Sequence, residues 1–447
     1  MRVTIEPSQP GGSIKAIASK SQAHRMLICA AFADRPTDIV CRELSQDIEA
    51  TAECLRAMGS GISYDKEKGL FRVVPVNCEP DRKSGSAGEG LRNRTQIDVG
   101  ESGSTLRFLL PVVCALAIDT HIVMHGRLPQ RPLSPLWEEL ERHGAVLSRN
   151  ADGSVDTSGA LKGTEFSVAA DVSSQFISGL LFALPIMARK YDIIEEMSIR
   201  LTGKTESENY ILMTIDALKR FGVDIRREAD RLIMRAGSRY SSPGTAEVEG
   251  DWSNGAFWLC AAAMSRRELN VSGLDAASSQ GDRAVTELIR QIIAADSEKT
   301  VIDAGNVPDL VPVLSVLAAS VKKETVFIHA ERLRIKESDR IKSTVELIRG
   351  LGGDAGETED GLRVNGSGRL KGGTVDSCND HRIAMSAAVA SIICEEAVTV
   401  TNAQAVRKSY PVFWKDLESL GVRVDISDPS VQEEPGARAV ASVTAAK

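Results

Sequence analysis

Two cations stand directly before an alanine-rich apolar segment near the start of the sequence. Lys20 and Arg25 lie in the motif SKSQAHR, and the run MLICAAFA follows it. A cation is electrostatically disfavoured at the positive N-terminal end of a helix, and a bound anion removes that conflict. We therefore expect Lys20 and Arg25 to bind an anionic ligand. The alternative is a pair of solvent-exposed cations without a ligand.

Basic and acidic residues alternate in the segment RLRIKESDR, which contains Lys336, Glu337 and Arg340. Alternating charge is most often a solvated helix face. The same cations form an anion site if the segment faces a ligand. The segment alone does not decide between these two interpretations.

Two further apolar segments begin with titratable residues. His381 and Arg382 precede IAMSAAVASII, and Asp309 lies in NVPDL. A lone histidine is usually a packing residue, but a histidine beside an arginine at a helix start is a candidate anion or proton site. An Asp at such a place most often caps the helix. As a functional residue, Asp309 would be a general base whose pKa is raised by partial burial.

Glycine and neutral hydrogen-bond donors begin two more apolar segments. In ESGSTLRF, Gly103 lies between two serines, where the backbone can approach a ligand closely. The motif VSSQF offers hydroxyl and amide donors at Ser173, Ser174 and Gln175. The alternative for both motifs is ordinary helix capping.

Several kinds of site are not predicted. The sequence has no HExxH, CxxC or calcium-loop pattern, and no P-loop or nucleophile elbow. We expect neither a metal nor a cofactor. Several of the eight cysteines lie in apolar runs, so we expect reduced thiols. The GSAGEG of the loop 80–96 lacks the strand-to-helix context of a dinucleotide site.

Length and charge narrow the class of protein. A chain of 447 residues indicates two to three domains. The 54 Lys and Arg against 61 Asp and Glu give a net charge of −7, which argues against general binding of nucleic acid. The longest apolar runs, such as 108–118, are too short to span a bilayer, and the N-terminus has no signal-peptide pattern. We expect a cytoplasmic protein with no nucleic-acid or membrane partner and a disordered tail over 426–447.

A polar cluster followed at once by an apolar helix recurs six times, starting at residues 19, 101, 173, 251, 306 and 378. A charged amphipathic helix follows each of them. Five of these six amphipathic helices end in Gly, the usual left-handed C-cap, whereas DRAVTELIRQII does not. Helices that are apolar all round are buried on all sides. We therefore expect an α/β fold of six units, three in each of two similar domains, with buried helices inside, sheets outside and six polar helix ends converging on one anion-binding cleft.

Ten motifs, in this order, resemble the family of 5-enolpyruvylshikimate-3-phosphate synthases, also called 3-phosphoshikimate 1-carboxyvinyltransferases. The motifs are SKSQAHR, GESGSTLRF, GRLPQRPL, SSQF, SENY, VEGDWS, NVPDL, LRIKESDR, DSCNDHRIAM and RKSYP. The resemblance implies two domains, each of three βαβαββ units arranged as an inside-out α/β barrel. One domain would comprise residues 1–17 and 248–425 and clamp phosphoenolpyruvate. The other would comprise residues 18–247 and bind shikimate-3-phosphate.

The reaction that the resemblance implies transfers the enolpyruvyl group of phosphoenolpyruvate to the 5-hydroxyl of shikimate-3-phosphate and releases phosphate. It is a step on the shikimate pathway to chorismate and the aromatic amino acids. The transfer proceeds by addition and elimination, so carbon 3 of phosphoenolpyruvate is first protonated and later deprotonated. Both steps need groups that switch between acid and base.

The matching motifs also imply roles for single residues. Lys20, Asp309 and Glu337 would be catalytic, with Asp309 taking the 5-hydroxyl proton and Glu337 handling the proton on carbon 3. Shikimate-3-phosphate would be bound by Lys20, Ser21, Arg25, Ser173, Ser174, Gln175, Ser207, Tyr210, Asp309 and Lys336. Phosphoenolpyruvate would be bound by Lys20, Gly103, Arg127, Gln175, Arg340, Arg382 and Lys408. His381 would support Arg382. Arg107 and Asp251 are candidates for residues that hold the binding side chains in place without contacting a substrate.

These roles place seven cations and two acids around two substrates that repel each other. A protein of net negative charge would thus concentrate positive charge where two anions must meet. Because the site residues come from both domains, we expect the domains of a monomer to close on the substrates.

Two positions depart from the pattern of the family. Glu101 stands where the family commonly has Asn, and its carboxylate would repel phosphoenolpyruvate unless it turns away or pairs with an arginine. Arg332 stands where some members have an Asn that contacts shikimate-3-phosphate. No role is carried over to either residue.

Two rival functions are weighed against this one. The first is the sister enolpyruvyl transferase that acts on a UDP-amino sugar, whose reactive cysteine lies in a loop, whereas Cys114 here falls within an apolar helix. The second is a non-catalytic binder or an RNA-end enzyme built on the same kind of repeated unit. The acidic charge balance and the pairing of Asp309 with Glu337 argue against it.

Overall fold

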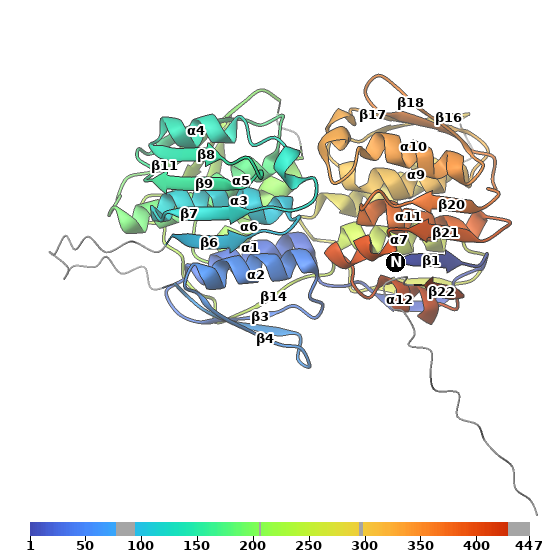
Figure 1. Cartoon of the computed structure of the whole chain (residues 1–447), viewed down its shortest axis with the longest axis horizontal. Coiled ribbons are helices and arrows are strands. Elements are labelled where there is room, and N and C mark those ends of the chain that lie inside the picture. The colour runs from blue at the N-terminus through green and yellow to red at the C-terminus, as the bar shows by residue number, and fades with distance from the viewer. Residues whose placement is uncertain (77–93, 205–206, 295–297, 428–447) are drawn as a thin grey trace, which may run out of the picture.

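The computed structural model describes residues 1–76, 94–204, 207–294 and 298–427 (Figure 1). Most of the loop 80–96, and all but the first two residues of the tail 426–447, therefore lie outside the described residues. No helix in the described ranges combines the length and the apolar character needed to cross a membrane.

The described chain forms two halves that lie side by side, each with its own hydrophobic core (Figure 1). The core of the first half draws its buried residues from positions 18–248, and that of the second half from positions 3–17 and 252–422. The two segments that connect the halves run antiparallel, with Ala18 paired to Gly250. The Asp251 amide also donates to the Ile17 carbonyl at 2.8 Å.

A buried apolar helix forms at each of the six predicted positions. These helices are α1 (Lys20–Ala31), α3 (Gly103–Leu116) and α5 (Ser174–Lys190) in the first half, and α7 (Trp252–Met264), α9 (Val311–Ala319) and α11 (His381–Ala390) in the second. Helices α3 and α5 approach closely at Gly179. A Cβ atom there would lie 2.2 Å from the carbonyl oxygen of Arg107. Glycine at this position therefore allows the two helices to touch.

Polar side chains fix where most of the buried helices begin. Ser19, Ser102, Ser173, Asp251 and Asp380 each accept a hydrogen bond from a backbone N–H group of the following first turn. Such caps satisfy N–H groups that have no partner inside the helix. The sixth buried helix, α9, follows the short 3-10 helix η3 (Pro308–Leu310) instead.

The amphipathic helices lie outside the buried ones. They are α2 (Gln46–Ala57), α4 (Leu136–Arg142), α6 (Glu208–Arg220), α8 (Val285–Ile293), α10 (Arg340–Gly350) and α12 (Phe413–Ser419). The remaining 3-10 helices are η1 (Leu128–Gln130), η2 (Gly281–Ala284), η4 (Glu331–Ile335), η5 (Ser391–Ile393) and η6 (Ala403–Lys408).

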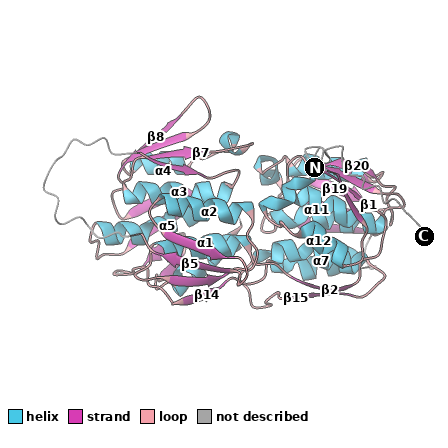
Figure 2. Ribbon diagram, turned by 60° about the horizontal axis from the view of Figure 1, so that its bottom comes forward, coloured by secondary structure: helices cyan, strands magenta, loops and turns pink. Residues whose placement is uncertain are grey.

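Six sheets surround the buried helices in the described part of the chain (Figure 2). In the first half the strands are β3 (Thr37–Val40), β4 (Gly61–Asp65), β5 (Leu70–Val74), β6 (Thr95–Asp98), β7 (Thr120–Val123), β8 (Ala145–Arg149), β9 (Val155–Gly159), β10 (Glu165–Ala169), β11 (Met197–Thr202), β12 (Ile225–Glu228), β13 (Arg231–Met234) and β14 (Thr245–Glu247). In the second half they are β1 (Arg2–Ile5), β2 (Gly12–Lys15), β15 (Leu269–Ser272), β16 (Lys299–Asp303), β17 (Glu324–Ile328), β18 (Asp354–Glu357), β19 (Leu362–Asn365), β20 (Gly373–Asp376), β21 (Val398–Thr401) and β22 (Val424–Ser427).

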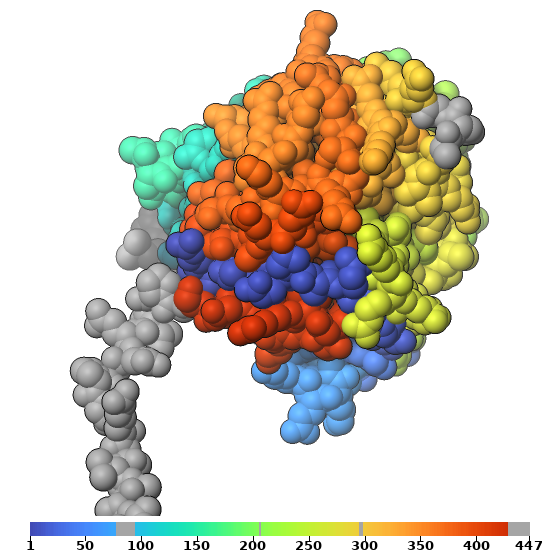
Figure 3. Space-filling model, turned by 90° about the vertical axis from the view of Figure 1, so that its right-hand side faces the viewer, coloured from blue at the N-terminus to red at the C-terminus, as the bar shows by residue number. Residues whose placement is uncertain are grey.

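Five of the sheets have four strands in one common order, such as β6–β7–β9–β8. In this example β6 and β7 are parallel, and β9 and β8 continue the sheet antiparallel. The buried helix α3 connects the parallel pair, as a crossover connection requires. Strand β1, from the start of the chain, completes the sheet of the last unit between β21 and β22 (Figure 3). The predicted α/β class, with helices inside and sheets outside, is confirmed.

The fourth unit departs from the common pattern. Its sheet contains only β2 and β15 among the described residues. Helix α8 ends without the glycine cap that the other surface helices have, and the next described strand, β16, already belongs to the following sheet. Helix α7 is correspondingly more open than its counterparts, with Ala263 exposed.

Candidate active site

A pocket lies between the two halves, and both halves contribute to its walls. Its lining residues are Lys20, Ser21, Arg25, Asp47, Gly103, Ser104, Phe108, Arg131, Ser173, Ser174, Gln175, Ser207, Tyr210, Asp309, Arg332, Lys336, Glu337, Arg340, His381 and Arg382. Five of the six predicted helix ends meet there, and the end of α7 does not line the pocket. Seven cations against three acids make the pocket positive, although the net charge of the chain is −7.

Arg25 is held rigidly in the first half. Its Nη1 donates to the carbonyl of Ser21 at 2.7 Å, its Nη2 to that of Tyr210 at 2.9 Å, and its Nε to Thr214 Oγ1 at 2.8 Å. The guanidinium group also lies 4.9 Å from the ring centroid of Phe108. A cation held in this way presents its charge to the pocket with little loss of side-chain entropy.

Helix α5 brings neutral donors to the same wall. Ser173 caps the helix and also lines the pocket, so the capping and ligand-binding interpretations of VSSQF are compatible. The Gln175 amide is fixed from two sides. Its Nε2 donates to Ser104 Oγ at 2.9 Å, and its Oε1 accepts from Arg107 Nη1 at 3.0 Å.

Two guanidinium groups converge over Gly103. A Cβ atom at Gly103 would lie 2.6 Å from Nη1 of Arg131 and 2.7 Å from Nη1 of Arg107. Neither Nε atom has a hydrogen-bond partner in the part of the chain that the structure describes. Burial, together with the charge of Arg131, holds the pKa of Arg107 well below its usual value. This positive charge, which Glu337 offsets only in part at 4.0 Å from Arg131 Nη1, favours an anion beside Gly103.

Arg127, expected from its motif to bind phosphoenolpyruvate, lies apart from the pocket, and its role stays a prediction. This residue is exposed at the N-terminal end of η1 and does not line the pocket. Arg131, at the other end of η1, lines the pocket, and its side chain is only 10% exposed. Both arginines belong to GRLPQRPL, and the single 3-10 turn between them leaves only the second one facing Gly103.

Arg340 organises the wall of the second half. Its side chain is 1% exposed and bonds three carboxylates. The distances are 2.7 Å from Nη1 to Asp309 Oδ1, 2.7 Å from Nη2 to Glu337 Oε2 and 2.7 Å from Nε to Asp380 Oδ2. Arg382 adds a contact of 2.9 Å to the other oxygen of Asp309. The segment 332–340 is therefore part of the pocket and not a solvated helix face.

Asp309 does not behave as the sequence led us to expect. Burial by itself raises the pKa of this carboxyl, but Arg382, Arg340 and Lys336 outweigh burial and hold the pKa well below its usual value. The carboxylate does not cap α9. Its Oδ2 atom instead accepts from Tyr210 Oη at 2.9 Å, across the gap between the halves.

Three neighbouring groups have shifted titration as well. Burial lowers the pKa of Lys336 to about 8. For Glu337, burial favours the neutral form, but Arg340 and Arg131 prevail and hold the pKa well below its usual value. Burial and nearby cations lower the pKa of His381, whose ring nitrogens have no hydrogen-bond partner among the described residues. His381 is therefore neutral at pH 7.

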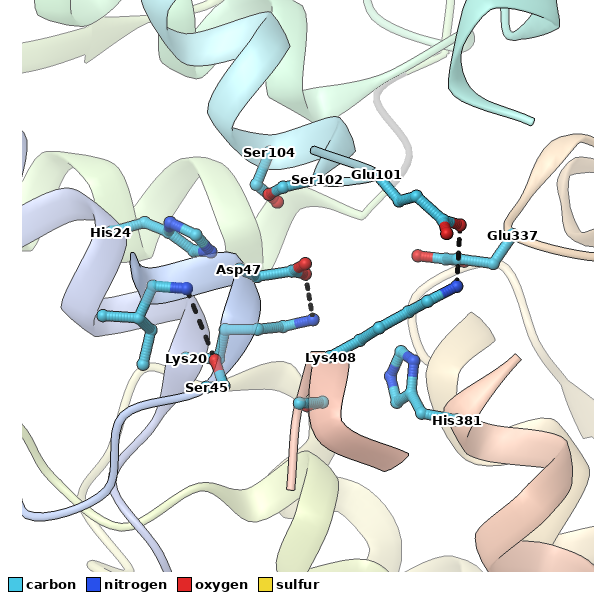
Figure 4. A network of polar contacts seen from close by, with 12 residues as sticks. Lys20, His24, Ser45, Asp47, Glu101, Ser102, Ser104, Glu337, His381 and Lys408 are labelled. Atoms are coloured by element: carbon cyan, nitrogen blue, oxygen red, sulfur yellow. Dashed lines mark hydrogen bonds and ion pairs between the residues drawn. The ribbon is translucent and has the colours of Figure 1, made fainter. Parts of the chain in front are cut away.

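Lys20 is paired with an acid that the sequence did not single out (Figure 4). Its Nζ lies 2.9 Å from Asp47 Oδ2, at the start of α2. Asp251 fixes the backbone of Lys20, because its Oδ2 accepts a hydrogen bond from the Lys20 backbone N–H at 3.1 Å. Asp251 thereby joins the N-termini of α1 and α7 at the connection between the halves.

Lys408 lies beside the pocket and does not line it. Its Nζ lies 2.7 Å from Glu101 Oε2, so Glu101, which does not line the pocket either, pairs with a lysine and not with an arginine (Figure 4). Arg332, in contrast, lines the pocket and donates from Nη1 to Ser207 Oγ at 3.2 Å.

Most of the side chains selected from the sequence thus meet in one place. All the residues to which substrate binding was assigned line the pocket, except Arg127 and Lys408. Sequence reasoning missed Asp47 and Arg131. The signal for Arg131 was the second arginine of GRLPQRPL, whereas Asp47 lies in a helix whose charges look like those of any surface helix.

Other kinds of site find little support. Within the described ranges, no group of three or more His, Cys, Asp or Glu side chains could hold a metal ion. The seven described cysteines are free, and all but Cys378 are buried. Burial raises the pKa of Cys114 to about 12, so its thiol is not a reactive nucleophile.

Comparisons with known proteins identify relatives over nearly the whole chain. The EPSP synthase (3-phosphoshikimate 1-carboxyvinyltransferase) family profile matches residues 6–417. A 3-phosphoshikimate 1-carboxyvinyltransferase from Clostridium perfringens is 39% identical over 94% of this chain and 98% of its own. Another from Clostridium acetobutylicum is 37% identical over 94% of this chain and 97% of its own.

Solved structures share the fold. An EPSP synthase from Acinetobacter baumannii superposes with a TM-score of 0.74 at 24% identity, covering 95% of this chain and all of its own. The enolpyruvyl transferase NikO from Streptomyces tendae gives a TM-score of 0.69 at 17% identity, over 95% of this chain and 98% of its own. With a matching profile over more than nine-tenths of its length and curated relatives at 37–39% identity, the chain belongs to the EPSP synthase family.

Proposed function

We propose that this chain transfers the enolpyruvyl group of phosphoenolpyruvate to the 5-hydroxyl of shikimate-3-phosphate and releases phosphate. One observation carries the proposal: cations from both halves of a single chain face one pocket at the ends of several helices. Such a pocket suits two small, multiply charged anions that repel each other in water. Membership of the EPSP synthase family supports the same reaction.

The first half would bind shikimate-3-phosphate. We assign this substrate to Lys20, Ser21, Arg25, Ser173, Ser174, Gln175, Ser207 and Tyr210, with Asp309 and Lys336 reaching it from the second half. The rigid setting of Arg25 and the hydroxyl groups at the start of α5 suit a phosphate. This assignment also makes residues 18–247 the domain for shikimate-3-phosphate.

Residues of both halves would clamp phosphoenolpyruvate. We assign this substrate to Lys20, Gly103, Arg131, Gln175, Arg340, Arg382 and Lys408, with Arg131 in the place first given to Arg127. The two guanidinium groups over Gly103 favour an anionic group at that end of the pocket. Residues 1–17 and 248–425 would form the domain that supplies Arg340, Arg382 and Lys408 to the clamp, and the first half would supply its other four residues.

Asp309 and Glu337 would move the protons. Both are ionised in the free pocket, because cations hold their pKa values low. In the addition step, Asp309 takes the proton of the 5-hydroxyl, whose oxygen bonds to carbon 2 while carbon 3 gains a proton from the Lys20 ammonium group. In the elimination step, Glu337 takes a proton from carbon 3 and the bond to phosphate breaks. An anion bound to Arg340 and Arg382 offsets their charge, which raises the pKa of Asp309 and makes it a better base.

We further propose that the chain works as a monomer, because both walls of the pocket come from one chain. Phosphorylated metabolites as substrates support a location in the cytoplasm. An assay of phosphate release, with the product identified by ³¹P NMR, tests the function. We expect release with shikimate-3-phosphate and phosphoenolpyruvate, and none when UDP-N-acetylglucosamine replaces the shikimate ester. Phosphate release with UDP-N-acetylglucosamine but not with shikimate-3-phosphate would contradict the proposal.

A further inference from the structure

Glu101 connects the two halves at the edge of the pocket. It lies in the first half, directly before Ser102, the N-cap of α3. Its carboxylate accepts from two groups of the second half. These are Lys408 Nζ at 2.7 Å and Asn379 Nδ2, at 3.1 and 3.2 Å from the two oxygens.

This contact is built into the fold, unlike a chance pairing of two long surface side chains. Lys408 is 9% exposed and Glu101 is 30% exposed. The lysine also donates to the Asn379 carbonyl at 2.7 Å, which fixes its ammonium group. Gly126 leaves room for the carboxylate, since a Cβ atom there would lie 2.5 Å from Glu101 Oε2. A partly buried and multiply bonded pair keeps its geometry better than a fully exposed pair does.

The pair lies next to the pocket. Gly103, two residues after Glu101, and His381, two residues after Asn379, both line it. Lys408 reaches toward Glu101 close to where Lys20 meets Asp47 (Figure 4). Two lysines expected to face phosphoenolpyruvate, one from each half, are thus each paired with a carboxylate.

We propose that Glu101 is a positioning residue that holds Lys408 across the cleft and lowers the affinity of the phosphoenolpyruvate end for anions. This inference rests on the proposed function. A phosphate or carboxylate group that approaches Lys408 must compete with Glu101 for the ammonium group and is repelled by its charge. The same competition weakens the hold on the inorganic phosphate that the reaction releases.

The charge of Glu101 can be removed with little change of shape. Glu101→Gln keeps an oxygen that accepts from Lys408. Glu101→Asp keeps the charge but shortens the reach to Lys408. Asp38→Asn is a matched control, because Asp38 is 32% exposed and forms an ion pair with Arg72 on β5.

The experiment measures KM for both substrates and the binding of inorganic phosphate by calorimetry, at low and high salt. In Glu101→Gln, KM for phosphoenolpyruvate and Kd for phosphate should fall about three- to tenfold, the scale of a partly screened charge contact. KM for shikimate-3-phosphate should change less, and high salt should shrink the effect. Glu101→Asp should keep both constants at or above the wild-type values, and Asp38→Asn should leave them unchanged.

Unchanged or weaker phosphate binding in Glu101→Gln would overturn the inference, whether or not Glu101→Asp behaves as expected. The phosphate titration needs no turnover, so it remains decisive even for a protein that shows no transfer. A wild-type chain without transfer activity would instead contradict the proposed function.

Discussion

Replacing Arg131 with methionine tests which arginine of GRLPQRPL faces phosphoenolpyruvate. The substitution removes a guanidinium group that converges with Arg107 over Gly103. Arg131 forms only a long ion pair with Glu337, 4.0 Å from Nη1 to Oε1, so an anionic ligand can bind the guanidinium group more closely than Glu337 does. Arg127→Met, four residues earlier, removes an exposed arginine and is the matched control.

The size of the effect follows from the burial of the group. A hydrogen bond to a charged partner contributes about 1.5–3 kcal/mol, and a side chain that is 10% exposed is poorly screened by water. Since about 1.4 kcal/mol corresponds to tenfold, we expect KM for phosphoenolpyruvate to rise roughly ten- to a hundredfold in Arg131→Met. In Arg127→Met it should change less than about twofold, as for other exposed charges.

Steady-state release of phosphate, with the concentration of phosphoenolpyruvate varied at saturating shikimate-3-phosphate, measures both variants. Thermal unfolding shows whether each variant is folded. A folded Arg131→Met with normal KM, or an Arg127→Met with the larger loss, would refute the assignment of Arg131.

Three further predictions concern the pocket and its frame. The Lys336 side chain, with a pKa of about 8, loses its positive charge as pH rises through that value, so kcat/KM for shikimate-3-phosphate should fall there. Lys336→Arg should move this fall to higher pH. A fall that stays at the same pH in Lys336→Arg would count against this role. Gly179→Ala should lower the free energy of unfolding in urea by about 1–3 kcal/mol, because its Cβ would lie 2.2 Å from a carbonyl oxygen of α3. In the control Gly350→Ala the Cβ would lie 3.5 Å from its nearest neighbour, so the free energy of unfolding should change by less than about 0.5 kcal/mol. Lys20→Met and Glu337→Ala should each reduce kcat at least about a hundredfold while the chain stays folded, and near-normal turnover in both would overturn the proton-transfer roles.

The positions of the binding groups could be predicted because most of the buried helices begin at a pattern that is visible in the local sequence. A polar cap followed by a long apolar run is a local signal, and Ser19, Ser102, Ser173, Asp251 and Asp380 all cap as such residues should. Once helices of this kind lie side by side, their N-termini gather. The two-stranded sheet of the fourth unit was not predicted, because the sequence pattern indicated six like units even though the surface helix of this one lacks the glycine cap.

Two features could not be predicted from the sequence: which way a side chain points, and how burial and nearby charges together set a pKa. From the sequence, Arg127 and Arg131 are equally plausible anion-binding residues. Only the geometry of η1 shows which of them faces the pocket. The pKa of Asp309 depends on burial against the charges of Arg340 and Arg382, which lie dozens of residues away in the sequence. Sequence reasoning counted burial and missed the cations, so it gave the wrong sign.

A crystal structure with both substrates trapped, or with the product and phosphate, tests the central claim most directly. We expect one ligand to lie between Arg25 and the start of α5, and the other between Gly103, Arg131 and Arg340, with Asp309 beside the 5-hydroxyl. A structure in which neither ligand occupies this cleft, or in which the two ligands bind at separate surfaces, would contradict the account.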